Sequence, residues 1–243
     1  MRDSIVKAVL RYISIYLILG LVLSSACLWL FAALAKQVLA GAPITAIDHE
    51  LANALHARTT PFGTTVYRLV TAFGGSWIIV IAIVVGLFFL VRRRWSYLAV
   101  WIIALVGGGL LSLQMKAIFA RPRPVFTNPL LIEESFSFPS AHAMTSLITY
   151  GILAYFLWHE VHNRIIRILI VFAAILLVIL VGISRMTLGV HYLSDVLGGF
   201  IAGGIWLGMC IAAMSILHLG EARLAAMDEQ EATSPLEVHA PTS

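Results

Sequence analysis

Six long stretches that lack Asp, Glu, Lys and Arg are the feature that most constrains how this chain can fold. Each is close to the ~20 residues that an α-helix needs to cross roughly 30 Å of hydrocarbon. Backbone groups in lipid must be satisfied within helices or closed barrels, and these stretches lack the alternation of barrel strands. We therefore expect an all-α integral membrane protein with six transmembrane helices in one bundle. The stretches are residues 12–35, 69–91, 95–115, 135–159, 168–184 and 196–220.

The composition agrees with a membrane protein. Hydrophobic residues make up 60% of the chain and charged residues only 12%, about half the charged fraction of an ordinary globular domain. We expect residues 1–220 to form one transmembrane domain and residues 221–243 to form a disordered cytoplasmic tail. Cys27 and Cys210 lie within hydrophobic stretches without C-x-x-C spacing, so neither a disulfide nor a metal site is expected.

The first stretch has two interpretations. Arg2, Lys7 and Arg11 precede it and Ala33-Leu34-Ala35 resembles a cleavage site, as in a secretory signal peptide. Its apolar part is far longer than the ~7–15 residues of a signal peptide. We therefore favour a retained helix.

The distribution of basic residues predicts the orientation, because cytoplasmic loops are enriched in Lys and Arg. Three consecutive arginines at 92–94 are the strongest anchor, and they place both termini in the cytoplasm. Several basic residues then remain on the outer side against this bias, and function is the simplest reason to retain them. They are Lys116, Arg121, Arg123 and Arg185.

The first outer loop, residues 36–64, contains a second pattern. Ile47, Leu51 and Leu55 recur every four residues, which predicts a short interfacial helix. The neighbouring 48–50 segment, Asp-His-Glu, together with His56, lacks the H-E-x-x-H spacing of a metal site. We interpret it as the solvated side of the interfacial helix.

Three polar segments are expected at the outer ends of helices three to six. They are KAIFARPRP at 116–124, FPSAH at 138–142 and SRMTLGVHYLSD at 184–195. A six-helix bundle brings these ends within reach of each other. Glu133 and Glu134, between the first two segments, have two interpretations. They could repel anions and tune access to the site, but we favour a solvated loop.

The residue types in these segments suit a multiply charged anion. Lys116, Arg123 and Arg185 supply three cations, and guanidinium groups match phosphate oxygens in bidentate fashion. Pro139 and Ser140 are typical of a helix start, where unpaired backbone N–H groups bind anions. Arg121 is an open case between an accessory phosphate contact and a structural residue.

Two histidines complete the constellation. His191 and Asp195 are four residues apart, so on a helix the carboxylate can accept the imidazole N–H and fix its tautomer. The other ring nitrogen of His191 is then a nucleophile. His142, in the first turn of the fourth helix, can protonate a leaving oxygen.

These segments resemble the three motifs of the type 2 phosphatidic acid phosphatase superfamily, which includes vanadium-dependent haloperoxidases. The family patterns are K-x6-R-P, P-S-G-H and S-R-x5-H-x3-D. The resemblance covers helices three to six. Ala141 departs from it, because it stands where the family has glycine. The matching residues are Lys116, Arg123, Pro124, Pro139, Ser140, His142, Ser184, Arg185, His191 and Asp195.

The resemblance implies a metal-independent mechanism without a cofactor. His191 would form a phosphohistidine, Asp195 would orient it and His142 would protonate the leaving group. The other site residues would stabilise charge on the phosphate oxygens. They are Lys116, Arg123, Ser140, the amide of Ala141, and Arg185.

The implied function is a lipid phosphatase in a bacterial plasma (inner) membrane, with its site facing the periplasm or cell exterior. Candidate substrates are undecaprenyl diphosphate, phosphatidylglycerophosphate and phosphatidic acid, with a slight preference for the diphosphate. Alternatives are a lipid-to-lipid phosphotransferase and, less favoured, a non-catalytic lipid-binding membrane protein. Haloperoxidase activity does not suit so lipophilic a chain. Membrane lipids are the expected surroundings, nucleic acid is not an expected partner, and the oligomeric state stays open.

Overall fold

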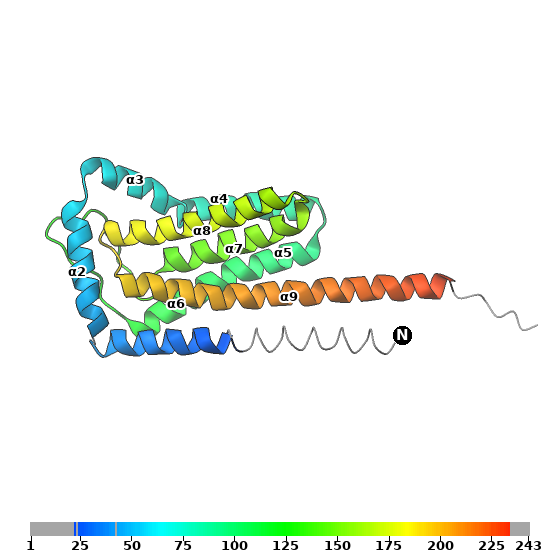
Figure 1. Ribbon diagram of the computed structural model, residues 1–243, viewed down its shortest axis with the longest axis horizontal. Helices are drawn as coiled ribbons and strands as arrows, with labels where there is room; N and C mark the ends of the chain where they lie inside the picture. Colours follow the sequence, from blue (N-terminus) through cyan, green and yellow to red (C-terminus); the bar gives the residue numbers. More distant parts are fainter. Residues whose placement is uncertain (1–21, 23, 42, 234–243) are drawn as a thin grey trace, which may run out of the picture.

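The computed structural model describes residues 22, 24–41 and 43–233, and within these ranges every regular element is a helix (Figure 1). The all-α prediction is confirmed for this part of the chain. The described part of the chain leaves out residues 1–21, 23, 42 and 234–243. The start of the expected first helix, the three basic residues before it and the end of the expected tail therefore lie outside the described residues. The helices are Ser24–Leu39, α2 (Pro43–Arg58), α3 (Pro61–Ala72), α4 (Ser76–Val91), α5 (Trp95–Ile102), the π-helical turn η1 (Ile103–Gly107), α6 (Gly108–Phe119), α7 (Ala141–Glu160), α8 (Arg164–Thr187) and α9 (Leu193–Thr233).

Several helices are long and apolar enough to cross a membrane, which supports the prediction of a membrane protein. A further span results if Ser24–Leu39 and Pro43–Arg58, bent by 79° to each other, count as one. The number of six transmembrane spans and the cytoplasmic location of both termini remain predictions. The four apolar helices within the described residues are Pro61–Val91, Trp95–Phe119, Arg164–Thr187 and Leu193–Leu217.

The expected fourth span, 135–159, corresponds to α7, which begins only at Ala141. α7 packs against α8 and α9 and buries Ser146, Thr149 and Tyr150 among its apolar residues. It is less apolar than the four helices above because these polar side chains face neighbouring helices instead of lipid. Residues 120–140 form an irregular connection that leads from α6 to α7.

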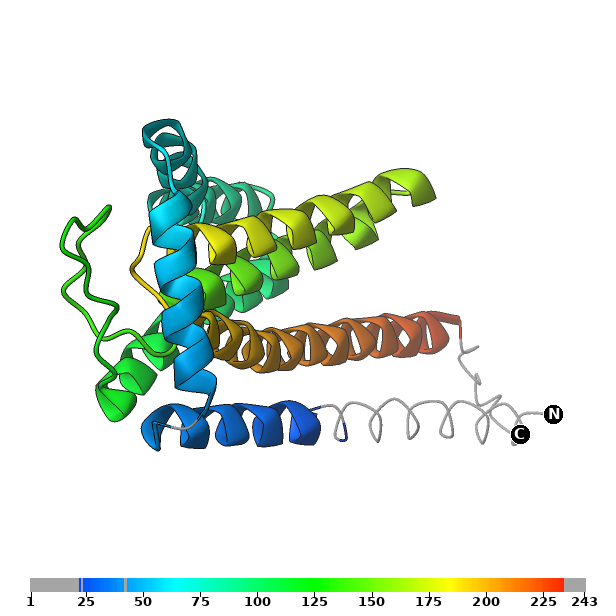
Figure 2. The same cartoon turned by 60° about the vertical axis from the view of Figure 1, so that its left-hand side comes forward.

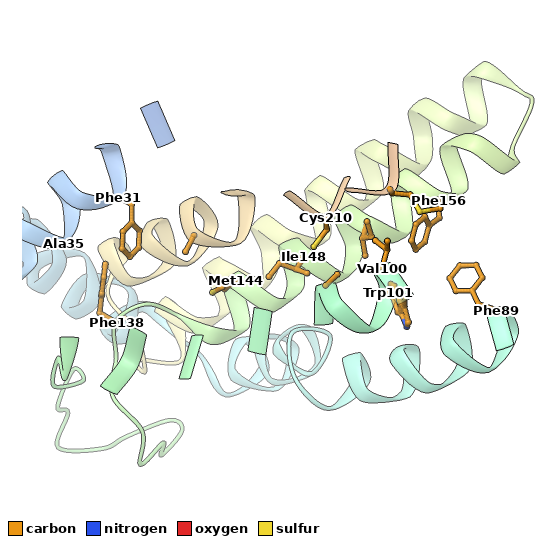
Figure 3. Packing of buried hydrophobic residues seen from close by; sticks show 14 of the residues in the cluster. Phe31, Ala35, Phe89, Val100, Trp101, Phe138, Met144, Ile148, Phe156 and Cys210 are labelled. Carbon is orange, nitrogen blue, oxygen red and sulfur yellow. The ribbon is translucent and has the colours of Figure 1, made fainter. Parts of the chain in front are cut away.

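Aromatic and aliphatic side chains from α4, α5, α7 and α9 form the main core (Figure 3). Trp101 and Phe156 lie together toward one end of this cluster, near Phe89, with exposures of 1% and 2% (Figure 3). The indole N–H of Trp101 donates to the backbone carbonyl of Ala82 at 3.1 Å, so its polar atom is satisfied inside the apolar layer.

Two glycines let α9 approach α7 closely. A Cβ atom at Gly199 would lie 2.6 Å from the carbonyl oxygen of Ser140, and one at Gly203 would lie 3.0 Å from that of Met144. Small residues spaced four apart, here Gly199 and Gly203, are typical of such close helix packing. The contact matters for the site because it holds the start of α7 beside the start of α9.

The connections of the bundle separate into two ends (Figures 1 and 2). The α6–α7 and α8–α9 connections lie at the same end as α2, which crosses the bundle there. The α4–α5 and α7–α8 connections lie at the opposite end, where Arg94 forms an ion pair with Glu160. The three polar segments therefore share one end, as predicted.

α2 contains the predicted apolar stripe, but one side of this helix is buried. Leu51 and Leu55 pack against the bundle, and Asp48 on the same face has an exposure of 0%. The prediction that Asp48 lies on a solvated surface was wrong, because residues 48, 51, 52 and 55 share one helical face. Within the described part of the chain, no three His, Cys, Asp or Glu side chains gather as metal ligands.

α9 continues beyond the expected end of the bundle. It runs as one helix to Thr233, so the predicted disordered tail does not begin at residue 221. The segment after Gly220 is rich in Ala and Glu, which are strong helix formers.

Candidate active site

The predicted pair His191 and Asp195 lies where the chain enters α9. His191 Nδ1 is 3.4 Å from Asp195 Oδ2, and the backbone N–H of Tyr192 donates to the same oxygen at 2.8 Å. Both side chains are nearly inaccessible, at 1% exposure for His191 and 0% for Asp195. The expected pair is present, although His191 precedes the helix, which begins at Leu193.

Arg123 identifies the tautomer of His191. Its Nη1 lies 3.2 Å from His191 Nε2 and donates to the carbonyl of Val190 at 2.7 Å. A guanidinium can only donate, so Nε2 is the acceptor and Nδ1 carries the proton toward Asp195. The lone pair of Nε2 therefore faces a cation, as a nucleophile for a bound anion requires.

Burial keeps this imidazole neutral. Desolvation lowers the pKa of His191 to about 4, and the positive charges of Arg185 and Arg123 act in the same direction. The hydrogen bond and charge of Asp195 oppose the shift but do not overcome it. At neutral pH the ring is therefore neutral, with Nε2 unprotonated.

Lys116 and Arg123 are joined through Ser135 in the α6–α7 connection. Arg123 Nη2 donates to Ser135 Oγ at 3.0 Å, Arg123 Nε donates to its carbonyl at 2.6 Å, and Lys116 Nζ is 3.4 Å from the same hydroxyl. Lys116 also donates to the carbonyl of Phe136. The first segment thus folds back on the residues that precede α7, which brings its two cations together.

Arg185, on α8, is the third cation and is 1% exposed. Its Nη1 donates to Thr71 Oγ1 of α3 at 3.1 Å, and its Nη2 donates to Glu133 at 2.6 Å. Its Nε is buried without a hydrogen-bond partner among the described residues. Buried donors are normally satisfied, so this N–H is available to an oxyanion.

Glu133 lies between the cations. Its Oε1 accepts from Arg185, and its Oε2 is 3.9 Å from Arg123 Nη2. Burial alone would raise the pKa of Glu133, but the hydrogen bond and charge of Arg185, with His142 and Arg123, lower it. A carboxylate therefore sits among the groups expected to bind phosphate. Of the two interpretations of Glu133, control of access to the anion site fits these contacts better than a solvated loop.

His142 is positioned by a break in the second predicted span. α3 ends at Ala72 and α4 begins at Ser76, and the ring of His142 packs on the Gly74-Gly75 turn between them. A Cβ atom at Gly75 would lie 2.8 Å from His142 Nε2. The turn is held to α7 because Tyr150 Oη donates to the carbonyl of Phe73 at 2.7 Å. Hydropathy does not reveal such a break.

The first turn of α7 begins at Ser140, whose side chain accepts from Ala143 N at 3.5 Å. The backbone N–H of Ser140 donates to the carbonyl of Asp195 at 2.9 Å. The amides of Ala141 and His142 belong to the first turn, where no intrahelical acceptor exists. Positive φ at non-glycine residues occurs in the described chain at Arg93 and Ala120, so alanine at 141 is unstrained.

Sequence reasoning missed Ser137. Its Oγ donates to Asp195 Oδ2 and lies 3.4 Å from His191 Nδ1, and the residue is fully buried. Ser137 is held there because its backbone N–H donates to the carbonyl of Arg121 at 2.8 Å. The one available signal was its place two residues before the P-S pair of the second motif.

Arg121 does not face the phosphate pocket. Its guanidinium binds Asp195 on one side and Asp48 of α2 on the other, and the residue is 8% exposed. These contacts fit the structural role of Arg121 better than an accessory phosphate contact. Asp48 and Ser194, which complete this arrangement, carried no signal in any motif.

A cleft of about 350 Å³ adjoins the site on the side of the α6–α7 connection. Arg123 and Glu133 line its charged end. Val125, Phe126 and Ile132 line its apolar part. Such a mixed lining suits a ligand that joins an anionic group to an apolar body.

Comparison with known proteins places this arrangement in a family. Residues 94–217 match the PAP2 superfamily. Phosphatidylglycerophosphatase B of Bacillus subtilis (strain 168) is 36% identical over 170 residues, which are 66% of this chain and 79% of that protein. The crystal structure of a transmembrane PAP2-type phosphatidylglycerolphosphate phosphatase from Bacillus subtilis superposes with a TM-score of 0.72 and 29% identity, covering 78% of this chain and 94% of that one.

A second solved structure shares the fold at a greater distance. Aquifex aeolicus LpxE superposes with a TM-score of 0.56 and 20% identity, over 68% of this chain and 95% of that one. The family match spans more than half of the chain and contains all three motif segments. The chain therefore belongs to the PAP2 superfamily, as the resemblance of its motifs predicted.

Proposed function

We propose that this PAP2 protein is a membrane lipid phosphatase in which His191 attacks phosphorus and forms a phosphohistidine. The observation that carries the proposal is the placement of His191 Nε2, unprotonated and 3.2 Å from Arg123, beside a buried and partly unpaired Arg185. Family membership and the relatives, which are named as phosphatidylglycerophosphatases, support hydrolysis of a lipid phosphate.

In the first step, the Nε2 lone pair of His191 forms a bond to phosphorus as the bond to the lipid oxygen breaks. Lys116, Arg123 and Arg185 stabilise the charge on the non-bridging oxygens, together with the free amides of the first turn of α7. His142 donates its proton to the leaving oxygen. Asp195 accepts the Nδ1–H hydrogen bond and stabilises the cationic phosphorylated ring.

In the second step, His142 removes a proton from water, which attacks phosphorus and breaks the bond to Nε2. Inorganic phosphate leaves and His191 returns to its starting form. The phosphate can first meet the unpaired Nε of Arg185, and Glu133 has to leave Nη2 before the whole guanidinium can bind the phosphate. The positive charge comes from side chains, so the chemistry requires no metal.

The substrate is proposed to be phosphatidylglycerophosphate, with undecaprenyl diphosphate and phosphatidic acid as the other candidates. The preference for the diphosphate in the sequence analysis rested on the outward site alone. The names of the relatives, as phosphatidylglycerophosphatases, favour phosphatidylglycerophosphate instead. A plasma-membrane location with the site facing away from the cytoplasm is part of the proposal, since the arginines at 92–94 lie at the opposite end.

The test is release of inorganic phosphate from the three lipids by purified protein in detergent, with EDTA present. His191→Ala is expected to lower kcat by more than about 10³-fold, since it removes the nucleophile. His162→Ala, at an exposed position at the other end of the bundle, is the matched control and should keep full activity. Activity in His191→Ala would refute the nucleophile. Loss of phosphate from the substrate only when a lipid alcohol is added, with formation of a new lipid phosphate and no inorganic phosphate, would indicate a phosphotransferase.

A further inference from the structure

Asp48 lies in a buried polar network that reaches the catalytic pair from outside the three motif segments. It belongs to α2 and has an exposure of 0%. Its Oδ1 accepts from the backbone N–H of Ser194 at 2.9 Å, and its Oδ2 accepts from the Ser194 hydroxyl and from Arg121 Nη2, the latter at 2.8 Å. A carboxylate with this many donors is held in one orientation.

Arg121 connects Asp48 to the catalytic pair. Its Nη2 binds Asp48, while its Nη1 donates to Asp195 Oδ1 and to Ser194 Oγ, the latter at 2.7 Å. The two oxygens of Asp195 therefore have separate partners. Oδ1 binds Arg121, and Oδ2 faces His191.

The ring of Tyr192 closes one side of this network. It lies 4.3 Å from the Arg121 guanidinium carbon in a cation–π contact. Arg121 is thereby enclosed by two carboxylates and an aromatic face, and it is 8% exposed. A guanidinium so enclosed cannot turn away from Asp195 without losing several contacts at once.

The charges of the network explain why a second carboxylate is needed. Asp195, Arg121 and Asp48 together carry one negative charge, and His191 gains positive charge when it attacks phosphorus. If Asp48 were neutral, Arg121 would cancel Asp195 and leave no net charge to balance the imidazolium. Charges removed from water interact strongly, so loss of this net negative charge would make the imidazolium of His191 less stable.

We propose that Asp48 is a positioning residue for the reaction, which offsets the charge of Arg121 so that Asp195 remains free to orient and stabilise His191. The inference rests on the proposed function, because it concerns the same histidine. It assigns a role in the chemistry to α2, which lies outside the family match at residues 94–217.

The first test is Asp48→Asn, which keeps the size and most hydrogen bonds of the side chain and removes its charge. The expected result is a decrease in kcat of about 10- to 100-fold, comparable with the loss of other residues that orient a catalytic group. KM should change by less than about threefold, since the phosphate-binding cations are untouched. Glu50→Gln, on the exposed side of the same helix, is the matched control and should equal wild type.

The second test restores the charge balance. Asp48→Asn combined with Arg121→Gln leaves Asp195 as the single charge of the network, which equals the net charge of wild type. The double variant is expected to have a higher kcat than either single variant. All values are normalised to monodisperse, folded protein, so a merely structural anchor would change yield and Tm without changing kcat.

Three outcomes would overturn the inference while leaving the proposed function intact. The first is a wild-type kcat in folded Asp48→Asn. The second is an increase in the KM of Asp48→Asn as large as the decrease in its kcat. The third is a double variant that is no more active than Arg121→Gln. The last comparison decides the matter even if Asp48→Asn alone does not fold. Full activity of His191→Ala, in contrast, would refute the proposed function itself.

Discussion

At the scale of single residues, Glu133 is the side chain that we expect a substrate to displace from Arg185 Nη2. It pairs with Arg185 at 2.6 Å and lies 3.9 Å from Arg123, in the position of an internal anion. The two arginines therefore have a partner before any ligand binds, and the cost of burying them unpaired is avoided. Binding of a phosphate becomes an exchange of one anion for another.

Glu133→Gln should therefore tighten substrate binding. A charge-assisted hydrogen bond of about 1.5 kcal/mol or more no longer has to be broken, so KM is expected to decrease by about tenfold with kcat little changed. The measurement is steady-state phosphate release, supported by the inhibition constant of vanadate. Glu134→Gln, at the exposed neighbouring position, is the control. A higher KM in Glu133→Gln would mean that the carboxylate holds Arg185 in place for the substrate.

At the scale of elements, the ends and breaks of helices place the reacting groups. α6 ends at Phe119 and is followed by Ala120, which adopts a left-handed conformation with φ 44°. This residue changes the direction of the chain just before Arg121 and Arg123. The Gly74-Gly75 turn between α3 and α4 makes room for His142. Each feature occupies one or two residues and leaves the hydropathy of the span unchanged.

Ala120→Gly should stabilise the protein. Glycine adopts positive φ without the steric cost of a Cβ atom, which is about 1 kcal/mol in this conformation. We expect a higher Tm in detergent and unchanged activity. Ala117→Gly, at an exposed position inside the same helix, should act in the opposite direction by a similar amount. Equal effects of the two substitutions would contradict the role of the left-handed cap.

Gly75→Ala should impair catalysis. The added Cβ atom would lie 2.8 Å from His142 Nε2, so the ring or the turn has to move. Loss of a well-placed general acid typically costs roughly 10²–10⁴ in rate, and a displaced ring is expected to reach the lower part of this range. The control is Gly109→Ala, where a Cβ atom would meet nothing within 4 Å. Near-normal kcat in Gly75→Ala would argue against His142 as the acid.

At the scale of the whole molecule, one end of the bundle carries the candidate site and the opposite end carries three consecutive arginines. The first of these ends contains α2, the three polar segments and the cleft beside Arg123. The opposite end contains the arginines at 92–94, of which Arg94 pairs with Glu160. The run of three arginines at 92–94 is the physical basis for the proposed orientation.

Cysteine labelling in intact cells tests this orientation. Val125→Cys, at a position 93% exposed in the α6–α7 connection, should react with a membrane-impermeant maleimide from outside. His162→Cys, in the α7–α8 connection, should react only after the membrane is opened. The unsubstituted chain measures the background from Cys27 and Cys210. Reversed labelling of the two positions would place the active site in the cytoplasm.

The sequence alone determined the features that depend on local composition and spacing. Long apolar stretches predicted the helical membrane fold, and the three motifs predicted which residues gather around His191, because spacing on a helix and order along a bundle follow from chain geometry. Only the tertiary structure decided what the remaining polar residues do. Asp48 and Arg121 are 73 residues apart, and Glu133 and Arg185 are 52 apart. No local rule connects such pairs, since their partners are chosen by how the helices pack.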